Sequence, residues 1–264
     1  LSLVGLGDVY KRQDDSGPTY GYYKLSEQEC YHWQDTKEEY QDTPNSLWGG
    51  YYSAIAAANM ALNAIEEKGN PASLDPQRGE ALVCRAYCHF MLANIFCNAY
   101  DTHASQSLGV PYMEEVETTV SPRYERGTLE EVYRKVERDL LEGIDLISDD
   151  SYSVPKYHFT RKAAYAFAAR FYLYYMKPDF SNCDRVIDFA TRVLGTNPAD
   201  LLRNWEALGN LSVNGNVQAD AYIASSNEAN LLISSTVSNW GAIGSDYLIG
   251  PRLSLIHISE PTRL

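Results

Sequence analysis

Cys84 and Cys88 stand four residues apart, a spacing that invites a chemical role. On a helix, this spacing places both thiols on one face, one turn apart, where two thiolates could ligate a metal ion. The residues around them are apolar, however, and a buried free thiol on an apolar helix face is the commoner arrangement. The sequence has five cysteines, an odd number, and no pair in a CxxC spacing. We therefore expect no metal site, and cysteine usage does not settle the compartment.

Motifs of known catalytic chemistry are also missing. His89, His103 and His158 are far apart in the sequence, which contains no HExxH, no GxSxG and no glycine-rich phosphate loop. Carboxylate pairs are abundant in an acidic chain and do not discriminate between functions. The sequence leaves open a catalytic cluster whose residues come together only in the fold. The sequence predicts neither an enzyme nor a cofactor.

Aromatic residues are the more informative group, since the sequence holds 21 Tyr against 7 Phe. Tyrosine and tryptophan suit amphipathic contact surfaces, and their rings can stack on sugars. A single tyrosine more often fills a seam between helices. Trp48 shares an apolar helical stripe, which predicts a core position, but its place at the entrance of a helix leaves ligand binding open. Trp240 is the better candidate, because nearby Asn239 and Asp246 could hold the hydroxyls of a glycan.

The formal net charge of −13 excludes several partners. Nucleic-acid binding needs a basic face that displaces counterions, and an anionic membrane surface attracts basic segments. We therefore expect no nucleic-acid partner and no direct attachment to anionic lipid. No apolar run approaches the roughly 20 residues of a membrane span.

Helical periodicity predicts the elements that position these residues. The predicted helices run from Thr43-Pro44-Asn45 to a stop at Gly69-Asn70-Pro71, from Asp75 to about Tyr100, from Thr128 through Ile147, from Thr160 through Tyr175, and over 181–194. Capping boxes are predicted at Thr128 with Glu131 and at Ser181 with Asp184. Residues 209–246 are rich in Gly, Asn and Ser and predict loops, with short strands at 221–224 and 231–234.

Helix pairs with short connections, and alternating small and large residues, are typical of tetratricopeptide-like solenoids. No strict repeat of about 34 residues is visible. We predict an all-α fold of tetratricopeptide-like helical pairs, an irregular α-solenoid with a loop-rich C-terminal segment. Polar residues on its buried faces have structural interpretations: we expect Arg85 and Arg170 to form internal ion pairs or carbonyl clamps, and Asn59 to make a packing hydrogen bond.

The two ends of the chain are related in an unusual way. Residues 5–13 (GLGDVYKRQ) and 253–261 (LSLIHISEP) can be encoded by one DNA string translated on opposite strands, and that string resembles a transposase adapter of sequencing libraries. We therefore expect residues 1–13 and 253–264 to be translated adapter. The predicted organisation is a helical-repeat scaffold over 14–208, followed over 209–252 by the loop-rich start of a truncated C-terminal part.

Four stretches in a shared order carry a family resemblance. They are 47–59 (LWGGYYSAIAAAN), 78–90 (RGEALVCRAYCHF), 126–140 (RGTLEEVYRKVERDL) and 160–173 (TRKAAYAFAARFYL). These stretches resemble the W-x-x-x-Y-x-x-I-x-x-x-N, G-E-A-x-x-x-R-A-x-x-x-F, R-x-T-x-x-E-V-Y and T-x-x-A-A helices of SusD/RagB-type nutrient-binding lipoproteins. The usual glycine before Val110-Pro111 is present, whereas Tyr112 stands where leucine is common.

The resemblance implies a surface-exposed outer-membrane lipoprotein of Bacteroidota-type bacteria. Such proteins cover a TonB-dependent transporter of the SusC type and deliver captured oligosaccharides to it, or peptides in some members. The resemblance also implies attachment only through a lipid anchor that lies upstream of this fragment. Three alternatives stay open: a peptide-binding member of the family, a helical-repeat adaptor for a protein partner, and a helical glycoside hydrolase with two carboxylates in a cleft.

Overall fold

The computed structural model of the chain describes residues 29, 32–37, 43–119, 122–212 and 217–234. Residues 48–237 form a compact unit, and nearly all described residues belong to it. The end segments 1–13 and 253–264, predicted to be translated adapter, lie outside the described residues.

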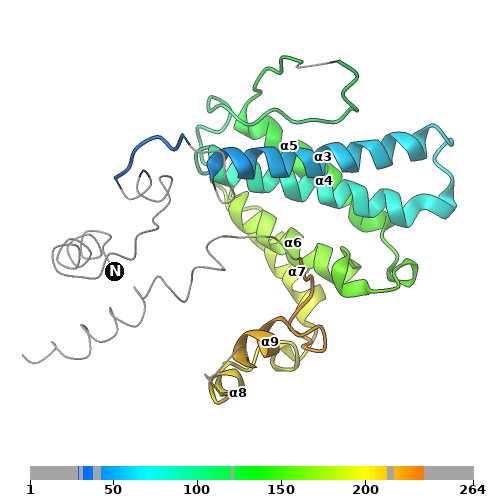
Figure 1. Cartoon of the computed structure of the whole chain (residues 1–264), viewed down its shortest axis with the longest axis vertical. Helices are drawn as coiled ribbons and strands as arrows, with labels where there is room; N and C mark the ends of the chain where they lie inside the picture. Colours follow the sequence, from blue (N-terminus) through cyan, green and yellow to red (C-terminus); the bar gives the residue numbers. More distant parts are fainter. Residues whose placement is uncertain (1–28, 30–31, 38–42, 120–121, 213–216, 235–264) are drawn as a thin grey trace, which may run out of the picture. The chain divides into compact units, whose positions relative to one another are not determined.

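The described residues form helices joined by turns and extended segments, without any named strand among them (Figure 1). The α-helices are α3 (Pro44–Glu66), α4 (Asp75–Phe96), α5 (Leu129–Leu146), α6 (Arg161–Tyr174), α7 (Cys183–Leu194), α8 (Trp205–Gly209) and α9 (Val217–Ile223). Short 3₁₀ turns are η1 (Ala72–Leu74), η2 (Asp149–Ser151), η3 (Pro155–Tyr157) and η4 (Pro198–Asp200). The predicted all-α class is confirmed.

Helices α3 and α4 lie side by side as an antiparallel pair (Figure 1). After α3, Gly69 and Asn70 take the left-handed φ values of 79° and 51°, and Pro71 follows, so the helix cannot continue. The ring of Trp48, near the start of α3, then lies 5.0 Å from the ring of Phe96 at the end of α4.

Helices α4 and α5 approach closely where two glycines face each other. A Cβ atom on Gly143 would lie 2.7 Å from the carbonyl oxygen of Gly79, and a Cβ on Gly79 would lie 2.7 Å from the carbonyl oxygen of Gly143. These obstacles are backbone atoms, which cannot turn away as a side chain could. Only glycine at both positions allows this approach, which brings the polar residues farther along the two helices within hydrogen-bond distance.

Aromatic rings fill the seams between α4, α5, α6 and α7. The ring of Tyr133 lies 5.8 Å from that of Phe171, and the ring of Tyr172 stacks on that of Phe189 at 5.7 Å. The hydroxyl of Tyr172 still finds a partner, since it donates to Glu137 at 2.8 Å. The interpretation of most tyrosines as seam-filling residues is confirmed for these positions.

The predicted helix starts are confirmed in two cases and wrong in one. The side chain of Thr128 accepts from the backbone of Glu131, whose carboxylate accepts in return from the backbone N–H of Thr128, and Thr160 caps α6. The second capping box, at Ser181 and Asp184, is wrong. The residue before α7 is Asn182, which has helical dihedral angles and uses its side-chain amide to donate to the carbonyl of Tyr175.

The predicted strands at 221–224 and 231–234 are also wrong. Residues 217–223 form α9, whose sequence VQADAYI contains good helix formers. Residues 231–234 have no strand partner in the described part of the chain, and the backbone N–H of Ile233 donates instead to the carbonyl of Lys156 at 2.7 Å. Across the residues that the structure describes, every helix falls short of the length and apolar character that crossing a bilayer requires.

Candidate functional site

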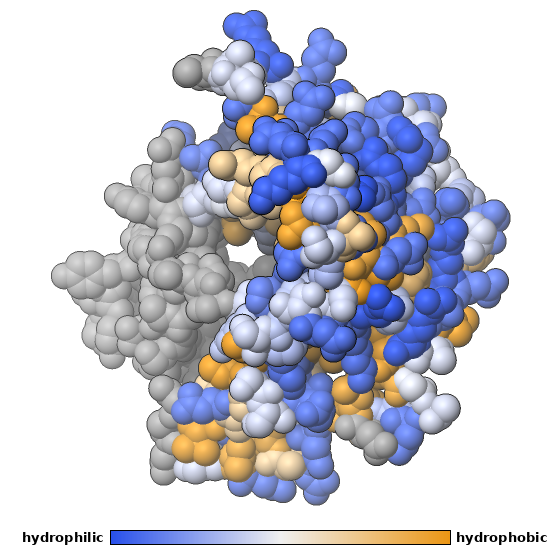
Figure 2. All heavy atoms as spheres, turned by 90° about the vertical axis from the view of Figure 1, so that its right-hand side faces the viewer, coloured by the Kyte–Doolittle hydropathy of each residue, from blue (hydrophilic) through white to orange (hydrophobic). Residues whose placement is uncertain are grey.

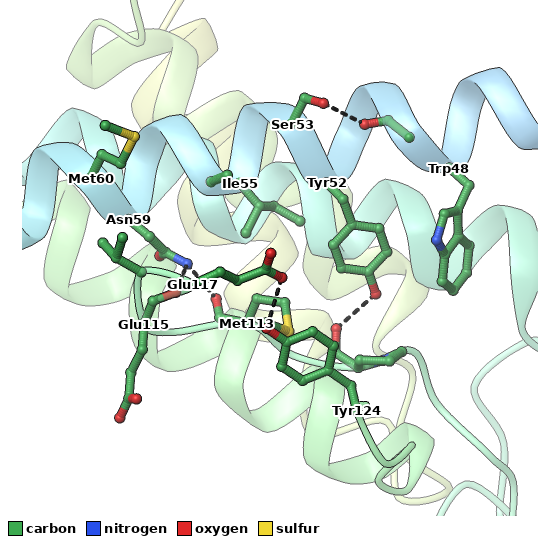
Figure 3. Close-up of a pocket in the computed structure, with 14 residues that line it drawn as sticks. Trp48, Tyr52, Ser53, Ile55, Asn59, Met60, Met113, Glu115, Glu117 and Tyr124 are labelled. Carbon is green, nitrogen blue, oxygen red and sulfur yellow. Dashed lines mark hydrogen bonds between the residues drawn. The ribbon is translucent and has the colours of Figure 1, made fainter. Parts of the chain in front are cut away.

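A cavity of about 470 Å³ lies between α3 and the extended segment that connects α4 to α5 (Figure 3). One wall comes from the first four turns of α3 and the other from residues 111–117 and Tyr124. Its lining residues are Trp48, Gly49, Tyr52, Ser53, Ile55, Ala56, Asn59, Met60, Pro111, Met113, Glu115, Val116, Glu117 and Tyr124. The cavity therefore has a helical wall fixed by the core and an extended wall that needs its own anchors.

The extended wall is anchored first at Gly109. Its N–H donates to the carbonyl of Gly127 at 2.8 Å, and its carbonyl accepts from the Nε of Arg126 at 2.6 Å. A Cβ on Gly109 would lie 2.6 Å from the Cγ2 of Val132 and 2.8 Å from the carbonyl oxygen of Thr128. Glycine here lets the chain cross the start of α5 in close contact.

His89 holds the next part of this wall. Its Nδ1 lies 2.9 Å from the carbonyl oxygen of Arg85, and its Nε2 accepts the backbone N–H of Met113 at 3.0 Å. A carbonyl only accepts, so Nδ1 carries the proton and the ring is neutral. Burial lowers the pKa of His89 to about 4, in agreement with this arrangement. The ring of Tyr112 stacks on the imidazole at 3.8 Å.

A buried ion pair between α4 and α5 supports the same wall. The Nε of Arg85 donates to Asp139 at 2.6 Å, and both side chains are nearly inaccessible to solvent. The hydroxyl of Tyr112 donates to the same carboxylate at 2.7 Å. Burial raises the pKa of the Tyr112 hydroxyl well above its ordinary value, and the nearby carboxylate raises it further, so the tyrosine stays a donor. The internal ion pair predicted for Arg85 is confirmed.

Asn59 links the ion pair to both walls of the cavity. Its side-chain oxygen accepts from the Nη1 of Arg85 at 3.1 Å, and its amide donates to the carbonyls of Met113 at 3.2 Å and Glu115 at 3.3 Å. Asn59 is 2% exposed, so its polar atoms are fully engaged within the protein. The packing hydrogen bond predicted for Asn59 is confirmed, although the residue also lines the cavity.

Glutamates of the extended wall alternate in direction. Glu114 accepts from Lys135 and from the Nη2 of Arg138 at 2.6 Å. Burial works against its ionisation, but these two donors outweigh burial and lower the pKa of Glu114 below its ordinary value. Glu115 and Glu117 are exposed on the side of the cavity. The carboxylate of Glu117 accepts the hydroxyl of Tyr124 at 2.7 Å, a contact that bridges the rim (Figure 3).

Some of the predicted site residues lie within the described residues and others lie outside them. Trp48 lines the cavity, but it is half-buried, with its ring 4.9 Å from that of Tyr52 and 5.0 Å from that of Phe96. Its role in ligand binding stays a prediction. Asn239, Trp240 and Asp246 lie outside the described residues.

Sequence reasoning missed several residues of this region. Glu117 and Tyr124 lie in a connection with no periodicity, so no pattern could place them beside α3.

The internal ion pair predicted for Arg170 is wrong for the described residues: the side chain is exposed, and its guanidinium lies 6.0 Å from the ring centroid of Phe90 and 5.9 Å from that of Tyr174.

The two spaced cysteines lie in the core rather than at the cavity. Burial raises the pKa of Cys84 to about 12 and that of Cys88 to about 11. Both thiols are free and stay protonated at neutral pH, whereas a thiolate is the form that ligates metals and attacks electrophiles. The described part of the chain contains no group of three His, Cys, Asp or Glu side chains able to hold a metal ion.

The fold and the site together define a helical-repeat protein with a cavity of about 470 Å³ beside a buried polar network. Residues 8–173, more than half of the chain, match the SusD-like family model described as starch-binding associating with outer membrane. The chain therefore belongs to the SusD-like family. No curated protein sequence is similar enough to count as a match.

Solved structures show the same fold. A SusD superfamily protein of Bacteroides vulgatus is 22% identical with a TM-score of 0.55, over 78% of this chain and 42% of that one. A SusD superfamily protein of Bacteroides thetaiotaomicron is 21% identical with a TM-score of 0.53, over 67% and 41%. A candidate sugar-binding protein of B. vulgatus is 25% identical with a TM-score of 0.52, over 73% and 44%. The chain thus spans about two fifths of the length of each of these relatives.

Proposed function

We propose that this protein is the surface glycan-binding component of an outer-membrane nutrient uptake system. It captures an oligosaccharide and delivers it to a TonB-dependent transporter of the SusC type. The observation that carries the proposal is the family match over residues 8–173. The whole protein is attached to the cell surface by a lipid anchor, in keeping with the outer-membrane association of the family.

The chemistry of the cavity supports an oligosaccharide ligand. Its volume, about 470 Å³, falls within the range of roughly 300–1,000 Å³ typical of small-molecule sites. Tyr124, which is 44% exposed, offers a ring face, and Glu117 offers carboxylate oxygens to sugar hydroxyls. Asn59 is already satisfied by protein partners, so it supports the wall rather than contacting the sugar. The site is one for binding rather than for catalysis.

Titration calorimetry with a panel of oligosaccharides and peptides tests the proposal. We expect a member of the oligosaccharide panel to bind, and Tyr124→Ala to weaken that binding about fivefold, since a ring contact contributes on the order of 1 kcal/mol. Tyr157→Ala is the matched control, because Tyr157 is 59% exposed and lies outside the cavity lining. Peptide binding without glycan binding would instead identify a peptide-capturing member.

The transporter partnership needs a separate experiment. The full-length protein, carrying an affinity tag, is expected to co-purify with a TonB-dependent transporter from detergent-solubilised outer membranes. Absence of any transporter from the purified material, with glycan binding intact, would leave a glycan-binding protein but overturn its assignment to an uptake complex.

A further inference from the structure

The cavity carries uncompensated negative charge. Two of its lining residues are glutamates, Glu115 and Glu117, and none is Lys, Arg or His. Neither glutamate forms an ion pair within the described residues. The imbalance is local, because the adjacent Glu114 is fully paired.

Two cations of α5, Lys135 and Arg138, are engaged by carboxylates outside the cavity lining. Lys135 and Arg138 both bind Glu114, and Arg138 also donates to Asp139 at 2.7 Å. Arg126 donates to the carbonyl of Gly109 and keeps its full charge, but neither Arg126 nor Arg123 is among the residues that line the cavity. The extended segment therefore separates the charges: Glu114 faces the cations of α5, whereas Glu117 lies over the cavity.

Glu117 is the carboxylate best placed to meet a ligand. Figure 3 shows its side chain lying over the cavity beside Tyr124, whereas the carboxylate of Glu115 points away from α3. The hydroxyl of Tyr124 donates to Oε1 of Glu117 at 2.7 Å and fixes its direction. A carboxylate has about four acceptor positions, so Glu117 keeps acceptors free for sugar hydroxyls.

We infer that Glu117 makes the cavity a charge filter that accepts uncharged oligosaccharides and rejects those with carboxylate or sulfate groups. The inference rests on the proposed glycan-binding function and deepens it. A neutral sugar gains a charge-assisted hydrogen bond from Glu117, whereas an anionic group in the same place meets a like charge. Even at the dielectric constant of water, two like charges about 4 Å apart weaken binding roughly fivefold.

Matched ligand pairs test this inference on the whole chain. The probes are maltohexaose with its C6-oxidised, carboxylate-bearing counterpart, and fully methyl-esterified hexagalacturonate with free hexagalacturonate. For the pair that binds, we expect the anionic member to bind at least about fivefold more weakly at low salt, and the difference to shrink as salt screens the repulsion. Glu117→Gln is expected to weaken binding of the neutral ligand and to strengthen binding of the anionic one.

The control is Glu206→Gln, which changes the net charge equally but lies outside the cavity lining, and circular dichroism confirms that each variant folds. Neutral and anionic partners that bind equally, with no response to Glu117→Gln, would overturn the charge filter and leave glycan binding standing. A wild-type chain that binds none of the four probes would overturn the proposed function and the filter together. Preference for an anionic member would refute the filter alone.

Discussion

Asp139 is the position where a single substitution is expected to cost most stability. Its side chain is 1% exposed and accepts from the Nε of Arg85 at 2.6 Å, from Tyr112 at 2.7 Å, and from the Nε and Nη2 of Arg138 at 3.0 and 2.7 Å. In Asp139→Leu, the guanidinium of Arg85, 8% exposed, loses its counter-charge in a place that water cannot reach. Removal of one member of a buried ion pair costs about 3–5 kcal/mol, and we expect a loss of that size.

A matched control lies on the same two helices. Glu142 of α5 pairs with Arg78 of α4, but the two side chains are 42% and 31% exposed. Screening by solvent limits such a pair to about 1 kcal/mol or less, so Glu142→Leu is expected to be nearly neutral. Urea denaturation followed by circular dichroism measures the free energy of unfolding for both variants. Equal losses for Asp139→Leu and Glu142→Leu would refute the reasoning.

The double variant Arg85→Met/Asp139→Leu separates the ion pair from the loss of packing. Because it removes both charges, we expect it to lose less stability than the sum of the two single variants, by about 1–3 kcal/mol. It does not restore full stability, since the hydroxyl of Tyr112 keeps no acceptor in place of Asp139. Strict additivity of the two single substitutions would show that Arg85 and Asp139 do not interact.

Two further predictions concern the buried ring of His89 and the close contact between α4 and α5. The pKa of His89 lies at about 4 in the folded chain against an ordinary value of 6.5, so below about pH 6.5 the unfolded state binds a proton that the folded state refuses. Stability should therefore fall by about 2 kcal/mol more from pH 7.5 to about pH 5 in the wild type than in His89→Gln, and parallel pH profiles would contradict the neutral-ring assignment. Gly143→Ala forces α4 and α5 apart and is expected to lower the free energy of unfolding by about 1–3 kcal/mol, whereas Gly50→Ala on α3, with no atom within 4 Å, should raise it by about 0.5–1 kcal/mol in thermal or urea unfolding.

Helices were predictable from the sequence because their signals are local. The cap at Thr128, the stop at Gly69-Asn70 and the apolar spacing each involve residues a few positions apart, and the structure has helices there. The short α9 was missed, since seven residues carry less than two full turns of periodicity. The second capping box was wrong for another reason. Asn182 precedes α7 and its side chain donates to the carbonyl of Tyr175, a contact that the capping pattern does not include.

The cavity was predictable only in part, because its polar anchors join residues far apart in the chain. Because Arg85 lies on an otherwise apolar helix, the sequence indicated that it needs a partner. Nothing in the pattern of α5 identified Asp139 as that partner. Trp48 was identified as a candidate from its place at a helix entrance, whereas Glu117 and Tyr124 lie on a connection whose course is set by hydrogen bonds to Asn59 and His89. Local periodicity carries no information on such contacts.

The buried network and the binding wall form one structure, and this has a consequence for affinity. Asp139 holds the side chain of Tyr112, and Asn59 holds the carbonyls of Met113 and Glu115 in the extended wall. A substitution that loosens the network without unfolding the chain therefore makes ordering of the wall part of the cost of binding, and it lowers affinity without touching the ligand. Affinity lost through Glu117 depends on ligand charge, whereas affinity lost through the network is the same for neutral and anionic ligands, so the two causes can be told apart.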